Sequence, residues 1–539
     1  MTEIQNPILR GFNPDPSICR AGEDFYIATS TFEWYPGVQI SHSRDLVNWR
    51  AVGQALNRKE QLDMRGNPDS GGVWAPSLSY ADGKFWLIYT DVKRLDGSSK
   101  DAHNYLVTSD SIEGPWSDPI YMNSSGFDPS LFHDEDGRKW FVNMVWNHLA
   151  SQGDPNAPPK KLFGGILLQE YDPDAQRLTG QIKNIFPGSD LGLVEAPHLF
   201  KKNGYYYLIT AEGGTGYGHA VTYARSRTID GPYEMHPQTH LLRVFEEPDS
   251  PLQRTGHGQY VETQDGTPYH TFLCTRPLPG TRKSPMGRET GIARCAWGED
   301  DWLYLQDGGL VPPAREQAPN IPPHRFEPEP ETHDFTNLGK LPNTFMWPRT
   351  PEPERIFSLS PNGLELTGRE SIGSWFEQSL VARRQTEWDC EAQTKVSFDP
   401  EDFQQMAGLT AYYNRTQFHY LCVTRSPDGH RALNILSCHT WPEGTLSFPL
   451  EATVEIPETG PVWLALSIRR GTLQFSYSMD GESYTDIGPE LDAHILSDEG
   501  VRGEHSNFTG TFIGMAAQDL TGRAQQATFE FFTLRTHAS

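Results

Sequence analysis

The segment NPDPSICRAGEDFYIATS, residues 13–30, carries a pattern that the chain repeats and that decides its fold. Similar segments are WAPSLSYADGKFWLIYTD (74–91), FDPSLFHDEDGRKWFVNM (127–144) and EAPHLFKKNGYYYLITAE (195–212), with a weaker fifth copy, GHGQYVETQDGTPYHTFLCT (256–275). In each copy a strand-like stretch leads through a glycine or acidic turn to an aromatic-rich stretch, which is the pattern of a β-hairpin. Repeated β units of this size are typical of propeller blades, so five copies predict a five-bladed β-propeller.

The start of each repeat predicts where functional side chains gather. Equivalent residues would open the innermost strand of every blade, so their side chains are expected to converge on the central axis. Aligning the copies on their shared proline, or on glycine in the fifth, places these pairs just before that position: Pro14-Asp15, Trp74-Ala75, Phe127-Asp128, Glu195-Ala196 and Gly256-His257. Two aspartates, a glutamate, a histidine and a tryptophan are therefore expected at one small spot.

Three carboxylates at one spot indicate acid–base chemistry. A single aspartate before proline is ordinarily a turn residue whose side chain accepts local N–H bonds. Hydrolysis of a glycosidic bond, however, needs one carboxyl group as proton donor and a second as base or nucleophile. A third carboxylate nearby can raise the pKa of the acid through like-charge repulsion. Asp15, Asp128 and Glu195 supply that set.

The remainder of the chain predicts a second β domain. Seven prolines lie between Pro312 and Pro330, which indicates an extended linker along the surface. From about Asp334 the sequence again alternates in short strand-like runs, without the fivefold motif. We therefore predict an all-β protein: a propeller over residues 1–322 and a C-terminal β-sandwich, jelly-roll or concanavalin-like, over residues 323–539.

Composition excludes several classes of partner. The formal net charge of −25 disfavours nucleic acid and anionic membranes, which attract basic surfaces. The sequence has no run of about 18 apolar residues and no secretory signal at MTEIQNPILR. Its six cysteines show no metal-ligand spacing, as expected of buried free thiols in a reducing compartment. These features predict a cytoplasmic protein.

Residues 11–49, GFNPDPSICRAGEDFYIATSTFEWYPGVQISHSRDLVNW, resemble the opening of glycoside hydrolase family 43, in particular its β-xylosidase branch. The motifs GGVWAPSL, GFDPSLFHDEDG, VEAPHLFKKNGYYYL, GHGQ, GRET and EHSNFTG follow in order, so the resemblance covers essentially the whole chain. It implies that Asp15 is the general base, Glu195 the general acid, and Asp128 the residue that tunes and orients the acid. The family inverts at the anomeric carbon, which implies that Asp15 activates a water molecule rather than attacking the sugar.

The resemblance also implies a set of substrate contacts. Arg288 of GRET would hydrogen-bond hydroxyls of the terminal sugar, and Phe508 of EHSNFTG would reach across from the sandwich to close the pocket. The remaining expected contacts are aromatic walls and an axial histidine: Phe32, Trp74, Trp146 and His257. No cofactor is required, although His257 is a candidate ligand for a divalent cation such as Ca²⁺ in the central channel.

The sequence thus predicts an exo-acting enzyme that releases xylose from β-1,4-xylo-oligosaccharides by inversion, with side activity on α-L-arabinofuranosides. The alternative is an enzyme that is mainly an α-L-arabinofuranosidase. Relatives with the sandwich commonly form dimers or tetramers, so a homo-oligomer is expected. Two other classes stay open: a binding protein that merely kept the fold, and a retaining five-bladed fructan-type enzyme. The first would be expected to have lost one of the three carboxylates, and all three are present.

Overall fold

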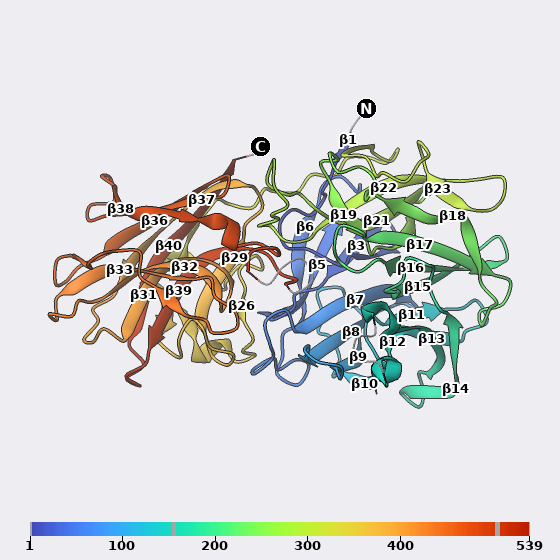
Figure 1. Ribbon diagram of the computed structural model, residues 1–539, viewed down its shortest axis with the longest axis horizontal. Coiled ribbons are helices and arrows are strands. Elements are labelled where there is room, and N and C mark those ends of the chain that lie inside the picture. Colours follow the sequence, from blue (N-terminus) through green and yellow to red (C-terminus); the bar gives the residue numbers. More distant parts are fainter. Residues whose placement is uncertain (1–2, 154–157, 502–506, 538–539) are drawn as a thin grey trace.

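The computed structural model describes residues 3–153, 158–501 and 507–537, and these contain strands and short 3₁₀ turns but no α-helix. The 3₁₀ turns are η1 (His148–Ser151), η2 (Pro159–Lys161), η3 (Phe335–Asn337), η4 (Pro353–Arg355) and η5 (Ala493–Ile495). Two β domains lie side by side, with the N-terminal one on the right of Figure 1 and the C-terminal one on the left. The prediction of an all-β protein is confirmed.

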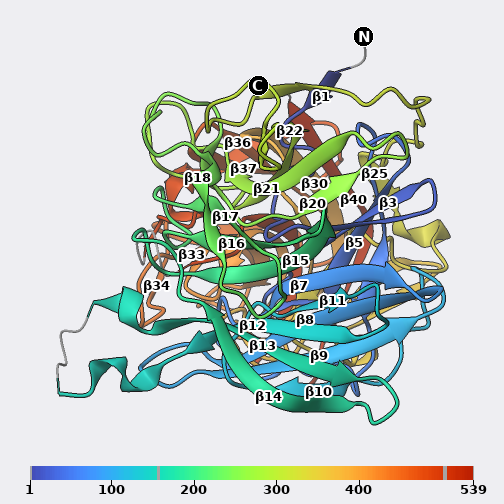
Figure 2. The ribbon, with the colours of Figure 1, turned by 90° about the vertical axis from the view of Figure 1, so that its right-hand side faces the viewer.

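The N-terminal domain consists of five antiparallel sheets arranged around one centre, which confirms the five-bladed propeller (Figure 2). The first four blades begin with the strand that the sequence repeat predicts, whereas the fifth repeat starts at Gly256, the last residue of the first strand of its blade. The strands of the five blades in turn are β2 (Ser17–Ala21), β3 (Asp24–Thr29), β5 (Gly37–Ser43), β6 (Arg50–Leu56); β7 (Gly72–Ala81), β8 (Lys84–Arg94), β9 (Asp101–Ser109), β10 (Ile120–Asn123); β11 (Ser130–His133), β12 (Lys139–Trp146), β13 (Phe163–Asp172), β14 (Arg177–Phe186); β15 (Glu195–Lys202), β16 (Tyr205–Glu212), β17 (Ala220–Ser226), β18 (Glu234–Arg243); and β19 (Gln253–Gly256), β20 (Tyr260–Glu262), β21 (Pro268–Thr275), β22 (Glu289–Trp297), β23 (Leu303–Leu305).

The fifth blade explains why its sequence motif is weaker. It has glycine, Gly258, where the other blades have proline. A Cβ atom at Gly258 would lie 1.8 Å from the carbonyl oxygen of Thr271 on the neighbouring strand β21. Only a residue without a side chain fits this close backbone approach, which explains why glycine occupies the position of the shared proline.

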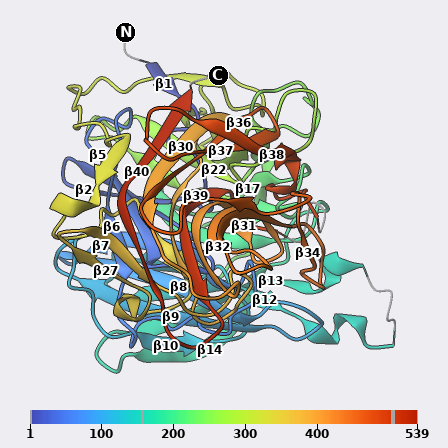
Figure 3. The same ribbon diagram turned by 90° about the vertical axis from the view of Figure 1, so that its left-hand side faces the viewer.

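The C-terminal domain is a sandwich of two antiparallel sheets, which faces the viewer in Figure 3. One sheet contains β25 (Thr332–Asp334), β27 (Phe357–Ser360), β28 (Gly363–Thr367), β30 (Asp389–Ser397), β36 (Val462–Arg469), β37 (Thr472–Ser478), β38 (Thr485–Asp492) and β40 (Gln526–His537). The other contains β29 (Ser379–Arg384), β31 (Gln405–Asn414), β32 (Gln417–Arg425), β33 (Arg431–Cys438), β34 (Leu446–Ser447), β35 (Val454–Glu455) and β39 (Phe512–Asp519). A shared apolar core fills the space between the two sheets.

Burial patterns show which sheet contacts the propeller. Along β30 buried and more exposed residues alternate, as expected of a sheet with one covered face. Along β32 every residue but the last is buried, which indicates cover on both faces. Phe418 and Tyr420 of β32 belong to one apolar cluster with Phe12 and Trp34 of the propeller. The second sheet therefore packs against the propeller.

A small joint sheet fixes the two domains to each other. Strand β4 (Trp34–Tyr35) of the propeller pairs with β26 (Trp347–Pro348), which lies between the sandwich strands β25 and β27 in the sequence. Beside it, the ring of Trp34 stacks on Phe512 of β39 with centroids 3.6 Å apart. Burying large aromatic side chains in this way contributes strongly to an interface.

The proline-rich stretch is mostly without strands but contains one that the sequence did not predict. Strand β24 (Arg315–Gln317) pairs with β1 (Glu3–Gln5), so the linker helps to hold the N-terminus. The last blade strand, β23, ends at Leu305, and the first sandwich strand, β25, begins at Thr332. The division at residue 322 falls between them and stays a prediction.

Candidate active site

The three carboxylates predicted to converge lie at the inner ends of their blades. Asp15 precedes β2, Asp128 precedes β11, and Glu195 opens β15. Each is at least nine-tenths buried, and their charges act on one another. The backbone is left-handed at Asp15 and Asp128, with φ of 56° and 54°. Residues other than glycine rarely adopt this conformation, and such strain concentrates at functional sites.

Asp15 is surrounded by groups that stabilise its ionised form. The hydroxyl of Ser30 donates to one carboxylate oxygen at 2.7 Å, and Arg288 Nη1 lies 3.1 Å from the other. His257 Nδ1 is 3.6 Å away. Burial alone would raise the pKa of Asp15, but Arg288, His257 and Ser30 together hold it below its usual value. Asp15 is therefore a carboxylate at neutral pH.

Glu195 has the opposite environment. Burial and the negative charge of Asp15 raise the pKa of Glu195 to about 8, although Arg288 and Lys100 act in the opposite direction. Glu195 therefore keeps its proton at neutral pH. Two nearby carboxyl groups whose pKa values are driven apart are the signature of an acid and base pair.

Asp128 lies beside Glu195 and contacts Ala196, the residue that follows Glu195. Its Oδ2 accepts a hydrogen bond of 3.2 Å from the N–H of Ala196. Burial, together with the charges of Glu195 and Asp15, raises the pKa of Asp128 well above its usual value. Of the two aspartates, Asp15 is the one whose repulsion raises the pKa of Glu195. The contact of Asp128 is thus of the kind that orients the strand from which Glu195 projects.

A group of aromatic rings lies against Arg288 and Lys100, which act on the carboxylates. Phe32, Trp74 and Phe508 lie against one another with ring centroids 5.9–6.2 Å apart. Phe127 connects this group to Trp146, with centroids 5.1 Å from Trp74 and 6.1 Å from Trp146. Aromatic faces are the surfaces on which the apolar faces of sugar rings pack. The structure thus brings the predicted rings together, including the one from the sandwich.

Arg288 joins the catalytic centre to the sandwich. It is 2% exposed, and while Nη1 pairs with Asp15, Nη2 donates to the carbonyl oxygen of Phe508 at 3.1 Å. Its guanidinium carbon lies 5.3 Å and 5.5 Å from the ring centroids of Phe32 and Phe508. The three residues before Asn507 in the EHSNFTG motif lie outside the described residues.

His257 is placed on the axis as expected, but its surroundings do not form a metal site. Burial lowers the pKa of His257 to about 4, so the imidazole is neutral. Arg288 acts electrostatically on His257 and would repel a cation. Among the described residues no group of three or more His, Cys, Asp or Glu is arranged to hold a metal ion. The divalent cation stays a prediction that this arrangement does not favour.

Three residues of the site were not singled out from the sequence. Ser30 follows the first hairpin in TSTFEW, and its position two residues before Phe32 was the only available signal. Phe127 stood at a converging position but received no role. Lys100 lies in the β8–β9 loop, with Nζ 4.5 Å from the Trp146 ring centroid and 5.8 Å from that of Trp74. No feature of DGSSK predicts that contact.

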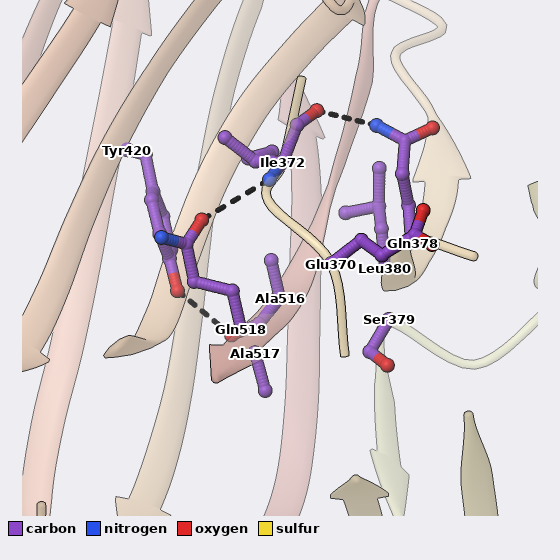
Figure 4. A pocket seen from close by; sticks show the side chains of 9 residues that line it. All are labelled: Glu370, Ile372, Gln378, Ser379, Leu380, Tyr420, Ala516, Ala517 and Gln518. Atoms are coloured by element: carbon purple, nitrogen blue, oxygen red, sulfur yellow. Dashed lines mark hydrogen bonds between the residues drawn. The ribbon is translucent and has the colours of Figure 1, made fainter. Parts of the chain in front are cut away.

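A small cavity lies in the sandwich between residues of β29, β32 and β39 (Figure 4). Its volume is about 10 Å³, room for one water molecule at most. Gln518 and Gln378 reach the backbone of Ile372 from either side of it. A sugar ring is too large to enter this cavity. Among the described residues, no helix has the length and apolar character needed to cross a bilayer.

A buried acid and base pair enclosed by aromatic rings at the centre of a propeller defines a glycoside hydrolase. Comparison with known families agrees: residues 4–303 match the model of Glycosyl hydrolases family 43, and residues 332–535 match the Beta xylosidase C-terminal Concanavalin A-like domain. The chain therefore belongs to glycosyl hydrolase family 43.

Individual relatives match over nearly their full length. The chain is 57% identical to Xylosidase/arabinosidase 43B of Humicola insolens, covering 99% of this chain and 98% of that protein. It is 47% identical to Beta-xylosidase of Bacillus subtilis, covering 98% and 99%. The crystal structure of xylan beta-1,4-xylosidase from Bacillus halodurans C-125 superposes with a TM-score of 0.94 at 49% identity, covering 99% and 100%.

Proposed function

We propose that this glycoside hydrolase is an exo-acting β-xylosidase that releases xylose from the non-reducing end of β-1,4-xylo-oligosaccharides by inversion. The observation that carries the proposal is the contrast between an ionised Asp15 and a protonated Glu195 within one aromatic pocket. The names of the relatives support xylosides as substrates. The ring of Phe508, which the sandwich places against Phe32 and Trp74, supports removal of one terminal sugar at a time.

In the proposed mechanism Glu195 donates its proton to the glycosidic oxygen as the bond to the leaving sugar breaks. Asp15 takes a proton from a water molecule, and that water attacks the anomeric carbon from the opposite face of the ring. Asp128 orients Glu195 through its bond to Ala196. Arg288 keeps Asp15 ionised and is proposed to hydrogen-bond hydroxyls of the terminal sugar. Each of these steps is carried by side chains of the chain itself.

The substrate contacts follow from the walls of the pocket. Phe32, Trp74 and Phe508 enclose the terminal xylose, and Trp146 lies toward the leaving sugar beside Phe127. His257 contacts Asp15 and is proposed to hold it in place as a neutral hydrogen-bonding group. Removal of α-L-arabinofuranosyl groups is proposed as a side activity, supported by the name of the 57% identical relative.

Product analysis of defined oligosaccharides tests this function. With xylotriose and xylotetraose we expect xylose plus the oligosaccharide shortened by one unit, and no xylobiose as a first product of xylotetraose. Early xylobiose from xylotetraose would show internal cleavage and contradict exo action. Faster hydrolysis of 4-nitrophenyl α-L-arabinofuranoside than of any xyloside would favour the arabinofuranosidase alternative.

We further propose a cytoplasmic homo-oligomer, a dimer or tetramer. All six cysteines are unpaired and buried, which supports a reducing compartment. On the sandwich, the Arg415 guanidinium lies 4.3 Å and 5.4 Å from the ring centroids of the exposed Trp375 and Trp441, and exposed apolar surface of this kind commonly marks subunit contacts. Light scattering coupled to size-exclusion chromatography tests the oligomer, and a monomeric mass would contradict it.

A further inference from the structure

Residues 507–511 of the sandwich extend toward the propeller and are hydrogen-bonded to it through their backbone. We call this segment the strap. The N–H of Phe508 donates to Ser70 Oγ at 3.1 Å, and the carbonyl of Phe508 accepts from Arg288 at 3.1 Å. Both backbone polar atoms of the pocket-closing residue are thus held by propeller side chains. Of these two side chains, Arg288 also pairs with Asp15, whereas no role has yet been assigned to Ser70.

Ser70 touches a second wall of the pocket at the same time. Its carbonyl oxygen accepts a hydrogen bond of 2.8 Å from the indole N–H of Trp74. One residue therefore contacts Trp74 through its backbone and Phe508 through its hydroxyl. The rings of those two residues lie 5.9 Å apart and nearly perpendicular, at an interplanar angle of 80°. Ser70 lies where the propeller wall and the sandwich wall meet.

Ser70 is itself held firmly in an unusual conformation. It is 1% exposed and its φ of 62° is left-handed, which is costly for a residue with a side chain. Its N–H donates to the buried carboxylate of Glu33 at 3.0 Å. The preceding residue, Asp69, pairs with Arg349 at 2.8 Å and Arg415 at 3.0 Å. These contacts from both domains fix the residue against its local preference.

The sandwich end of the strap is equally constrained. The N–H of Thr509 donates to the hydroxyl of Tyr413 at 3.1 Å, and that hydroxyl donates to Asp498 at 2.6 Å. Asp498 in turn pairs with Arg254 of the propeller strand β19 at 3.0 Å. Because Thr509 and the Phe508 carbonyl keep their own hydrogen bonds, loss of the Ser70 hydroxyl should act mainly on the position of the Phe508 ring.

We propose that Ser70 is a positioning residue that sets the spacing of Trp74 and Phe508, and thereby the affinity of the pocket for a terminal xylose. This rests on the proposed function, because the spacing matters for a sugar held between those rings. Ser70 is given no part in proton transfer, so binding of the terminal sugar should weaken while the chemical step is nearly unchanged.

The test replaces the hydroxyl in the full chain and separates binding from catalysis. In Ser70→Ala we expect KM for xylobiose and the inhibition constant of D-xylose to rise together by about three- to tenfold, with kcat within about twofold, because one buried N–H loses its acceptor. Ser70→Gly also removes the hydroxyl but relieves the left-handed strain, so the same rise in both variants assigns the effect to the hydroxyl. Ser109→Ala removes a partly buried hydroxyl bond of 3.0 Å to the carbonyl oxygen of Pro115 in the second blade and should change neither constant.

A double-mutant cycle shows whether the effect passes through the Phe508 ring. In the Phe508→Ala background, Ser70→Ala should raise KM little further. Full additivity, or unchanged KM and D-xylose inhibition in both Ser70 variants, would overturn the inference even if melting temperatures fall. A wild-type enzyme that neither cleaves xylobiose nor binds D-xylose would instead overturn the proposed function, and the inference with it.

Discussion

The centre of the propeller and the strap of the sandwich build opposite sides of one pocket by different routes. The centre is assembled by repetition: equivalent positions of separate blades supply Asp15, Asp128 and Glu195. The strap arrives by docking of a second domain, and contributes the ring and backbone carbonyl of Phe508. Repetition of the blade thus places the reacting carboxylates, whereas docking of the sandwich adds a wall of the pocket around them. Arg288, which contacts both Asp15 and Phe508, is where the two meet.

The largest effect is expected at the centre, from Glu195→Gln. Loss of the proton donor should lower kcat on xylobiose by about 10²- to 10⁴-fold. The loss should be much smaller with 4-nitrophenyl β-xyloside, because that leaving group departs without full protonation. Steady-state kinetics on both substrates measure the difference.

A surface glutamate of the fourth blade serves as the control for Glu195→Gln. Glu234 pairs with Arg225 at 2.6 Å on the outer strands, so Glu234→Gln should retain activity on both substrates. Equal losses on xylobiose and on the aryl xyloside in Glu195→Gln would argue against a proton donor at this position.

A moderate effect is expected on the docked side, from Phe508→Ala. Removing the ring should raise KM for xylobiose by roughly 3- to 10-fold, since aromatic contacts to Trp74 and Phe32 and to the bound sugar are lost. The change should leave the pH dependence of kcat as it was, because no titrating group is altered. Unchanged KM and unchanged preference among xylo-oligosaccharides would show that the strap does not form part of the pocket.

The smallest effect is expected at Lys100, which approaches the centre from a loop rather than from a repeat position. Its positive charge lowers the pKa of Glu195, which burial and Asp15 raise to about 8, and burial lowers the pKa of Lys100 itself to about 8. Activity of the wild type should therefore fall as the pH rises through about 8, where Glu195 loses its proton. In Lys100→Met the pKa of Glu195 should rise further, so this basic limb should move to higher pH.

Lys93→Met provides the matched control for Lys100→Met. Lys93 belongs to the same strand and loop region but pairs with Asp91 at 2.8 Å. Its replacement should leave the basic limb in place. A limb that moves to lower pH in Lys100→Met would show that the charge of Lys100 does not act on Glu195.

The sequence predicted what repetition builds and missed what docking and loops add. Alignment of the repeats was sufficient to bring Asp15, Asp128 and Glu195 together, because blade symmetry converts sequence position into spatial position. Ser30 and Lys100 lie outside the aligned positions, so the symmetry of the blades does not predict where their side chains lie. Phe508 was reached only through family resemblance, since its place in the pocket depends on how two domains pack.

The linker and the pKa values show the same limit. Prolines predicted an extended stretch, but the pairing of β24 with β1 depends on a partner more than 300 residues away. Similarly, three carboxylates in the sequence predict mutual repulsion, but they do not show which of the three is kept ionised by a positively charged partner. Arg288 stabilises the ionised form of Asp15. The position of Arg288 depends on both the fifth blade and the strap.

The measurement that tests the central claim most directly is proton NMR of xylobiose hydrolysis, recorded before the released xylose undergoes mutarotation. If Asp15 activates a water molecule and Glu195 donates the proton, the reaction inverts the anomeric centre. We therefore expect α-xylose to appear first from the cleaved β-linkage. Initial β-xylose would show retention, and would contradict the role of Asp15 as a base acting on water.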